Sequence, residues 1–471
     1  MTIRITRTNW LDPRAVAFRD QMDAEVQPLY AHLRDRVPLV ETDPETILVT
    51  LVATSDGDPV GTVALKRTGP FGEVKRLFVH ERGRRLGVAL ALMTEIERAA
   101  REEGYRELFL QTGSAQPHAM ALYEREGWLP VIPFGPYEGD TLLSRCYVKS
   151  LAEPIVAAEV NQDGSADGVL AHVTALDASG ADIAFIDDGT LDGAGGPSLD
   201  AALVAAAAAE ETARIALAPR VRVTHTEPFN VAKAVQSLDW SAAGRAAWLV
   251  DVSSTAAEAA AVGRRSAPQP DEAWAEAAAV IDTARRLWDS WEDDAEIRDI
   301  ATGRFIDADR LHYVDVETEW FSVKGPSIVP RSPQGQIPVA VEAGTDDASI
   351  AVAAREADIV RVSGPHAADI VRRVRVAAAH RPIRILVDVD PREAVAAPHG
   401  RDDDEQLAAW AAFLRAESGA DGVVLTGDAE TNARAARTIA RRPATAPTLR
   451  AALGLERPAS RYAAATKGPT R

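Results

Sequence analysis

The chain has 471 residues, which is too long for one ordinary hydrophobic core, so we expect two or three domains. Its 70 acidic and 52 basic side chains give a formal net charge of −18, which argues against nucleic acid or an anionic membrane as a partner. The single cysteine, Cys146, excludes a disulfide framework and a cysteine zinc cluster, and the histidines show no zinc-ligand spacing. The lone cysteine fits a reducing compartment, so we expect a cytoplasmic protein, and no apolar stretch is long enough for a membrane span.

Residues 47–67 contain two β-branched runs around the turn sequence "SDGD", a pattern that predicts an antiparallel hairpin. A third strand, "FGEVKRLFV", follows at 71–79. After it comes a predicted helix with Val88, Leu92 and Ile96 on one face. A strand, a short helix and a last strand then complete a first domain of residues 1–150; these are "RELFLQT", "AMALYERE" and "SRCYVKS".

From residue 151 short apolar strands alternate with alanine-rich helices, which is typical of a parallel sheet with buried strands. Eight such strands predict a closed (β/α)8 TIM barrel over 151–460, followed by a flexible tail at 461–471; an open doubly wound sheet is the alternative. The candidate strands are "IVAAEV", "ADIAFID", "RIALAPRVRV", "AAWLVDVS", "IPVAVEA", "ADIVRVS", "RILVDVD" and "DGVVLTG".

The sequence "HERGRRLGVALALM" at 80–93 places three arginines and Gly87 between a strand and a helix. The free N–H groups and positive dipole at the start of a helix can bind a pyrophosphate, and a glycine permits its close approach. A solvated arginine-rich turn is the alternative interpretation.

Residues 1–150 resemble the GNAT family of acetyl-CoA-dependent N-acetyltransferases. The resemblance rests on this strand and turn, which match the pattern (Q/R)xxGx(G/A) from Arg82 to Gly87, and on "LQTGSAQPHAMALYEREGWLPVIPFGPYEGD" at 110–140. It implies an α+β fold with a mixed sheet and direct acetyl transfer to a small amine or amino acid. Arg85 replaces the usual first glycine of the pattern. The implied acetyl-CoA contacts are Leu77, Phe78, Val79, Arg82, Arg84, Arg85, Leu86, Gly87, Val88 and Ala89.

The same resemblance assigns catalytic residues. Glu73 would be the general base, acting through water, and Tyr123 the acid that assists the departing thiolate. The alternatives are an exposed charged strand residue for Glu73 and a core tyrosine for Tyr123. In the first helices, Arg19 and Tyr30, with Arg14, are candidate substrate contacts. The rival bases His80 and His118 are interpreted as surface residues.

The segments at 224–254 and 285–344 resemble the luciferase-like flavin-dependent monooxygenases, in the branch that includes nitrilotriacetate monooxygenase. This family is a TIM barrel that binds reduced FMN, or in some relatives F420, at the carboxyl ends of its strands. Gly344 and Thr345 match its phosphate loop, and Glu227 and Asn230 lie in a segment expected to face the site.

Three residues depart from that pattern. Leu249 replaces an asparagine expected to touch the flavin, and Asp346 and Asp347 put negative charge where the flavin phosphate would sit, which is electrostatically unfavourable. We therefore predict an N-acetyltransferase fused to a barrel whose flavin binding is lost or changed. The alternatives are an FMN- or F420-dependent monooxygenase, served by a flavin reductase and carrying an accessory coenzyme A domain, and a non-catalytic binding protein. A homo-oligomer is left open.

Two further segments receive structural interpretations. Trp288 and Trp291 have the spacing of one helix face and are predicted to pack in the core. The acidic segment "PHGRDDDEQ" at 398–406 lacks the spacing of a calcium loop and is predicted to be a solvated loop.

Overall fold

The structure is a computed structural model that describes residues 2–33, 42–140, 142–162, 164–189, 197–224, 226–379, 381–395, 399–400, 402–440 and 446–462. Most of the predicted tail, from residue 463, lies outside the described residues. The chain divides into two compact units. The first comprises Met1–Glu153 and Glu393–Gly419, and the second comprises Pro154–Arg392 and Ala420–Arg471. The sequence pattern predicts one domain boundary, near residue 150. In the structure the chain also returns to the first unit later, because Glu393–Gly419 packs with it.

The first unit is built on a seven-stranded sheet of order β1-β2-β3-β4-β5-β7-β6. Only β4 and β5 run parallel, so the predicted mixed sheet is confirmed. Its strands are β1 (Ile3–Thr8), β2 (Ile47–Ser55), β3 (Asp58–Thr68), β4 (Phe71–Val79), β5 (Glu107–Gly113), β6 (Leu129–Val131) and β7 (Ser144–Ser150).

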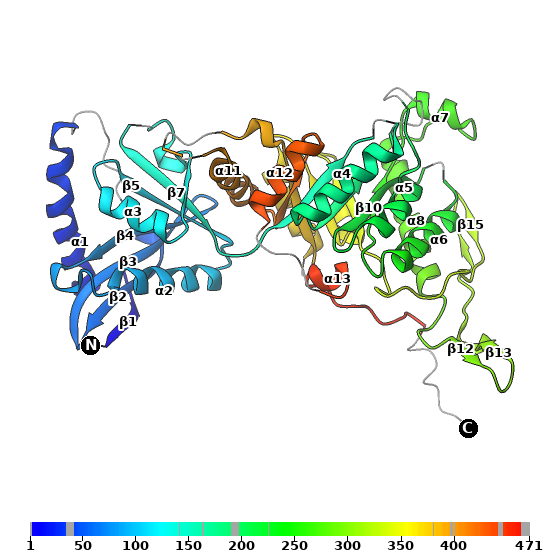
Figure 1. Cartoon of the computed structure of the whole chain (residues 1–471), viewed down its shortest axis with the longest axis horizontal. Coiled ribbons are helices and arrows are strands. Elements are labelled where there is room, and N and C mark those ends of the chain that lie inside the picture. The colour runs from blue at the N-terminus through cyan, green and yellow to red at the C-terminus, as the bar shows by residue number, and fades with distance from the viewer. Residues whose placement is uncertain are drawn as a thin grey trace. The chain divides into compact units, whose positions relative to one another are not determined.

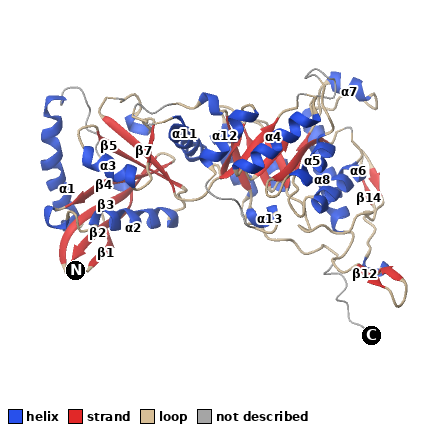
Figure 2. Ribbon diagram, in the orientation of Figure 1, coloured by secondary structure: helices blue, strands red, loops and turns tan. Residues whose placement is uncertain are grey.

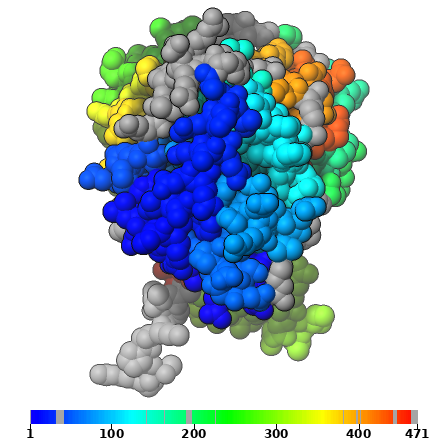
Figure 3. Space-filling view, turned by 90° about the vertical axis from the view of Figure 1, so that its left-hand side faces the viewer, coloured from blue at the N-terminus to red at the C-terminus, as the bar shows by residue number. Residues whose placement is uncertain are grey.

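Helix α2 runs along this sheet and buries Val88, Leu92 and Ile96 against it, as the sequence pattern predicts (Figure 1). The helices of the unit are α1 (Pro13–Val26), α2 (Val88–Glu102), α3 (Pro117–Arg125) and α11 (Asp403–Ser418). Short 3-10 turns are η1 (Gln27–Leu33), η2 (Pro44–Thr46), η3 (Glu81–Gly83) and η4 (Gly135–Tyr137). Figure 3 shows the early residues of the unit in blue beside its later residues in cyan.

Helix α11 packs on β6 and β7. The prediction of a solvated loop at 398–406 is wrong from Asp403 onward, because Asp402 caps this helix by accepting from the backbone N–H of Glu405. The acidic residues that suggested a loop are the first-turn residues that favour a helix N-terminus. The apolar residues that follow them bury one face of the helix.

The second unit is a closed barrel of eight parallel strands, and each of the eight predicted strands is present. Figure 2 draws strands of this unit in red among its blue helices. In barrel order they are β8 (Ile155–Val160), β9 (Ile183–Ile186), β10 (Ala216–Arg222), β11 (Trp248–Asp251), β16 (Val339–Ala343), β17 (Ile359–Val362), β18 (Arg384–Val389) and β19 (Gly422–Leu425).

Helices follow the barrel strands, as the alternation of apolar patterns predicts; the helix after β18 is α11 of the first unit, and the others belong to the second unit. They are α4 (Ala166–Ser179), α5 (Ala201–Glu211), α6 (Pro228–Ser241), α7 (Ala256–Val262), α8 (Pro270–Asp289), α9 (Asp347–Glu356), α10 (Ala367–Ala378), α12 (Ala429–Ile439) and α13 (Leu449–Ala452), with 3-10 turns η5 (Ala308–Arg310) and η6 (Pro391–Glu393). Two small hairpins are β12 (Glu296–Asp299) with β13 (Arg304–Ile306), and β14 (Val316–Glu317) with β15 (Ser322–Val323). None of the described helices is long and apolar enough to span a bilayer.

The two tryptophans occupy different environments. Trp288 is fully buried on α8 and meets Trp248 edge to face at 6.2 Å, as predicted for a core residue. Trp291 lies beyond the end of α8 and donates its Nε1–H to the carbonyl of Ser327 at 2.7 Å. The two residues therefore do not share a helix face.

Candidate functional site

Strands β4 and β5 separate within the sheet of the first unit. Their parallel pairing covers only Gly72–Val74 and Leu108–Leu110 among the described residues. Arg76 has a φ of 55°, and the register between β3 and β4 shifts beside it, so β4 bulges at this point. The edge of β4 from Leu77 to Val79 is thus left open toward β5, where an extended ligand can hydrogen-bond to it.

The turn after β4 presents an uncapped helix N-terminus beside this opening. Gly87, the N-cap of α2, has a φ of 80° and makes no side-chain cap hydrogen bond. The first-turn N–H groups, including those of Val88 and Ala89, have no intrahelical partner. Arg85 has a φ of 64°, a conformation that favours glycine, so the turn keeps the backbone shape expected of a glycine there.

The three arginines of the turn have different roles. Arg84 donates from Nε to the carbonyl of Val79 at 3.0 Å and pairs with Glu25 at 2.6 Å, so it braces the turn. Arg82 and Arg85 are exposed and make no side-chain ion pair within the described ranges. Of the three predicted arginines, Arg84 therefore stabilises the turn, whereas the guanidinium groups of Arg82 and Arg85 are available to bind an anion.

The predicted base, Glu73, is fully buried rather than on an exposed strand face. One carboxylate oxygen accepts from the Tyr137 hydroxyl at 2.8 Å and lies 3.2 Å from the Lys75 ammonium. The other accepts from the Thr68 hydroxyl at 2.5 Å and lies 4.0 Å from the Lys66 ammonium. The group sits next to Val74, where pairing with β5 ends, and its direct partners are protein atoms.

Lys75 and Tyr137 complete this cluster, and the sequence reasoning missed both. The Lys75 ammonium donates to the Tyr137 hydroxyl at 2.5 Å. Burial lowers the pKa of Lys75, and burial together with the charge of Glu73 raises the pKa of Tyr137. One signal in the sequence could have indicated the cluster. Phe71, Glu73 and Lys75 are spaced by two residues, so a strand places two opposite charges on the same face as an apolar side chain.

Tyr123, the predicted acid, is buried on α3 with its ring 5.8 Å from Tyr147 and 6.1 Å from Trp128. Burial raises the pKa of its phenol to about 12, so the group stays protonated at neutral pH. His80 accepts at Nδ1 from the backbone N–H of Arg82, and His118 is exposed on the first turn of the same helix as Tyr123.

The three candidate substrate contacts lie in different surroundings, and one of them, Tyr30, borders the opening between β4 and β5. Tyr30 lies against Gly113 at the end of β5 and accepts from the backbone N–H of Ala115 at 2.9 Å, so it borders the opening between the strands. Arg19 instead donates to the carbonyl of Trp10 at 2.8 Å and covers its ring. Arg14 pairs with the helix-capping Asp12.

The second unit carries a layer of charge inside its barrel. An apolar layer contains one residue from each strand, namely Ala157, Phe185, Ala218, Leu249, Ala340, Ile359, Leu386 and Val424. Two residues further along seven of these strands, the next layer carries Glu159, Asp187, Arg220, Asp251, Glu342, Arg361 and Asp388. Alternation along a strand sends both sets to the same side, so this charged layer lies at the carboxyl ends of the strands.

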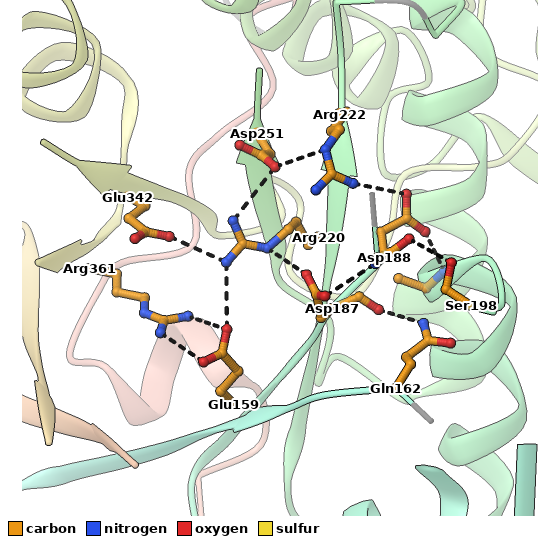
Figure 4. Close-up of polar contacts among 12 residues, drawn as sticks. Glu159, Gln162, Asp187, Asp188, Ser198, Arg220, Arg222, Asp251, Glu342 and Arg361 are labelled. Carbon is orange, nitrogen blue, oxygen red and sulfur yellow. Dashed lines mark hydrogen bonds and ion pairs between the residues drawn. The ribbon is translucent and has the colours of Figure 1, made fainter. Parts of the chain in front are cut away.

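The charged layer is cross-linked by ion pairs (Figure 4). Arg220 lies 3.1 Å from Asp187, 3.3 Å from Glu342, 3.6 Å from Asp251 and 3.8 Å from Glu159. Arg361 pairs with Glu159 and Asp388, and the nearby Arg222 pairs with Asp251, Asp188 and Glu258. Burial raises the pKa of Asp188 to about 6 and shifts the pKa values of Asp251 and Asp388 upward.

The predicted phosphate loop is already capped by the protein. Asp346 accepts from the backbone N–H and the hydroxyl of Ser349 at the start of α9, and that hydroxyl in turn accepts from the N–H of Gly344. The carbonyl of Thr345 accepts from Arg373, which also pairs with Asp347. The backbone N–H groups of Gly344 and Ser349 are therefore engaged by side chains of this loop.

The other residues expected near a flavin have structural roles. Glu227 is the N-cap of α6 and accepts from the backbone N–H of Asn230 at 3.0 Å. Leu249 packs in the apolar layer below the charges. A cavity of about 470 Å³ lies instead at the ends of β8 and β19, beside His172 and the helix-capping Asp428.

A flavin at the strand ends would need two kinds of contact. Its ring requires apolar surface and its phosphate requires free donors. The described strand ends offer paired charges, and the loop at α9 offers a carboxylate. Over the described residues there is also no cluster of three or more His, Cys, Asp or Glu side chains arranged for a metal ion.

The sequence profile of the acetyltransferase (GNAT) family matches residues 8–128, and that of the luciferase-like monooxygenase family matches residues 150–466. IAA acetyltransferase of Azospirillum brasilense is 34% identical over 146 residues, which cover 30% of this chain and 93% of that protein. One component of the pristinamycin IIA synthase of Streptomyces pristinaespiralis is 32% identical over 323 residues, which cover 67% of this chain and 100% of that protein.

Other relatives match over a shorter stretch. N-acetyl-S-(2-succino)cysteine monooxygenase of Bacillus subtilis (strain 168) is 36% identical over 160 residues, which cover 34% of this chain and 36% of that enzyme. The chain thus spans about a third of the length of that relative. A crystal structure of riboflavin lyase with modified FMN and riboflavin has a TM-score of 0.56 and 20% identity, covering 66% of this chain and 98% of that chain, which shows a shared fold.

Proposed function

Because the chain belongs to both the GNAT acetyltransferase family and the luciferase-like monooxygenase family, we propose that its first unit transfers the acetyl group of acetyl-CoA to a small primary amine. The uncapped N-terminus of α2, placed beside the opening between β4 and β5, is the observation that carries this proposal. It offers phosphate donors at one end of an extended site and an open strand edge along it.

Each part of the site has a role in binding acetyl-CoA. The first-turn N–H groups of α2 bind the pyrophosphate, with Arg82 and Arg85 supplying charge. The open edge of β4 at Leu77–Val79 hydrogen-bonds the pantetheine arm. This arrangement brings the thioester toward the cluster of Glu73, Lys75 and Tyr137, which adjoins the point where the strands separate.

The reaction joins the amine nitrogen to the thioester carbonyl carbon and breaks the carbon–sulfur bond. The amine must lose a proton, and Glu73 is too buried to take it directly. We assign the transfer to the Tyr137 hydroxyl, which accepts that proton while passing its own to Glu73. Tyr123 gives its phenolic proton to the departing sulfur, so that coenzyme A leaves as the thiol, and the phenolate then recovers a proton from solvent.

The acceptor class we favour is a small amine or an amino acid. The name of the B. subtilis relative describes an oxygenase for an N-acetylated cysteine derivative. Because this chain joins an N-acetyltransferase to a barrel of that family, we include S-substituted cysteines among the proposed acceptors.

For the second unit we propose a barrel that acts without flavin at its strand ends, because paired charges occupy that layer. The second candidate is an FMN- or F420-dependent monooxygenase, which membership of the luciferase-like family favours. Binding of FMN separates the two.

The test of acetyl transfer is thiol release from acetyl-CoA by the full chain with a panel of the standard amino acids, S-alkylated cysteines, spermidine and tyramine. We expect turnover with at least one acceptor, confirmed by the mass of the acetylated product. Glu73→Gln should lower kcat at least tenfold, whereas Glu103→Gln, at an exposed position, should not. Absence of acetyl-CoA binding by calorimetry would remove the proposal.

A further inference from the structure

Helix α11 supplies part of the core of the first unit, although its residues lie between two barrel strands in the sequence. The ring of Phe413 stacks on Phe71 of β4 with centroids 5.6 Å apart and meets Phe109 of β5 at 6.4 Å. Ala409 and Ala412 enter the same apolar cluster. The sheet face that carries Phe71 and Phe109 is therefore covered by a helix that residues 1–150 do not contain.

Polar contacts fix the position of this helix. Arg415 lies 2.7 Å from Glu107, and their side chains are only 2% and 4% exposed. Arg415 also donates to the hydroxyl of Ser150 at 3.1 Å. A buried ion pair requires matched geometry, because either charge without the other carries a large desolvation penalty. Helix α11 is thus held in one register on the sheet.

The aromatic cluster under α11 continues to the candidate proton acceptor. Phe134 lies 5.3 Å from Phe71 and 5.6 Å from Tyr137, ring to ring. Tyr137 donates to Glu73, and Glu73 follows Phe71 by two residues on the same face of β4. Phe413 therefore touches the layer that positions both partners of the Tyr137–Glu73 hydrogen bond.

We propose that α11 is a working part of the acetyltransferase, with Phe413 as a positioning residue for the Tyr137–Glu73 pair. The proposal rests on the proposed function of the first unit. It means that the catalytic unit extends beyond the family profile at 8–128 and uses a segment from within the luciferase-like profile at 150–466. Phe413 acts through packing and touches no substrate.

Hydrogen exchange in the full chain tests the packing without any ligand. Phe413→Ala should lower protection at least tenfold in peptides covering 71–79 and 129–138, and Phe413→Leu should restore most of it. Phe305→Ala, which removes the same side chain from a 59% exposed position in the second unit, is the matched control and should leave these peptides unchanged. Unchanged protection in Phe413→Ala would overturn the proposal whether or not acetyl transfer occurs.

Kinetics test the positioning role. Phe413→Ala should lower kcat about tenfold and leave the KM for acetyl-CoA within twofold, because the apolar cluster under α11 includes no described residue of the α2 turn. Phe413→Leu should recover most of the lost kcat. The positioning role of Phe413 would be rejected if kcat were unchanged. It would also be rejected if kcat fell only in proportion to the fraction of folded protein. Failure of the proposed function would appear differently, as no acetyl-CoA binding in the unmodified chain.

Discussion

Arg361 and Asp388, on the neighbouring barrel strands β17 and β18, form a two-point ion pair in which Nε lies 2.7 Å from Oδ1 and Nη2 lies 2.7 Å from Oδ2. Arg361 is only 3% exposed and also pairs with Glu159. Bidentate geometry and burial make such a pair rigid and costly to separate. A ligand entering this layer must displace a connected set of charges rather than solvent.

We therefore expect no saturable quenching of FMN fluorescence by the full chain up to about 100 μM protein, which corresponds to a binding free energy weaker than about 5.5 kcal/mol. The same titration with F420 should also be flat. Riboflavin serves as the control for quenching that does not involve the phosphate. A low-micromolar dissociation constant for FMN would contradict this expectation and favour the monooxygenase candidate.

The arginines of the α2 turn predict a selective effect on acetyl-CoA binding. Replacing Arg82 and Arg85 together with alanine removes two exposed guanidinium groups that have no ion pair in the described structure. We expect about a tenfold weaker dissociation constant, or about 1.4 kcal/mol, by calorimetry at low salt. Arg67→Ala, at an exposed position on β3, is the control. An equal loss in both variants would show a nonspecific effect of charge.

Tyr123→Phe should lower kcat at least tenfold while the melting temperature changes by no more than a few degrees, because only the hydroxyl is removed from a ring that packs on Trp128 and Tyr147. Its phenol, with a pKa raised to about 12, is protonated throughout the neutral range, so the deficit should not vary between pH 6 and 9. Unchanged kinetics would remove Tyr123 from the mechanism.

Asp188 predicts a pH-dependent stability difference. Burial raises the pKa of its folded state to about 6, against about 3.9 in an unfolded chain. Between these values the folded state binds more protons, so this group's contribution to stability falls as the pH rises from about 4 to 6 and stays lower at neutral pH. Asp188→Asn removes this titration.

The variant should accordingly be more stable than the unmodified chain by about 1–2 kcal/mol at pH 7, with no gain near pH 4. Urea denaturation at both pH values measures the difference. Glu210→Gln, an exposed change, should have little effect at either pH. A gain of equal size at pH 4 would show that packing, rather than charge, produces the effect.

The elements of both units were predictable because their patterns are local. Alternating apolar runs identified the eight barrel strands, and the 3.6-residue period identified the buried face of α2. The packing of α11 on the first unit was not predictable. An amphipathic pattern shows that one face of a helix is buried, but it does not show which surface that face packs against. Its acidic first turn, the usual signature of a helix start, was interpreted as a loop.

The residues of the two sites were harder to predict from the sequence than the elements were, because their contacts join distant parts of the chain. The alternative interpretation of Glu73 placed it on an exposed face, because a charged strand residue usually lies there, but its partner Tyr137 comes from a turn 64 residues later. The charged barrel layer did leave a signal: seven of the eight predicted strands carry one charged residue at the same layer. Only closure of the barrel shows that these residues face one another.

The late position of α11 also sets an order of events during synthesis. The strands that carry Phe71 and Phe109 are made long before Phe413, and at usual translation rates the delay is roughly 15 to 70 seconds. Throughout that time the growing chain exposes an aromatic sheet face that only a later helix covers. The first unit to leave the ribosome is thus among the last to be completed, and it needs protection from aggregation in the meantime.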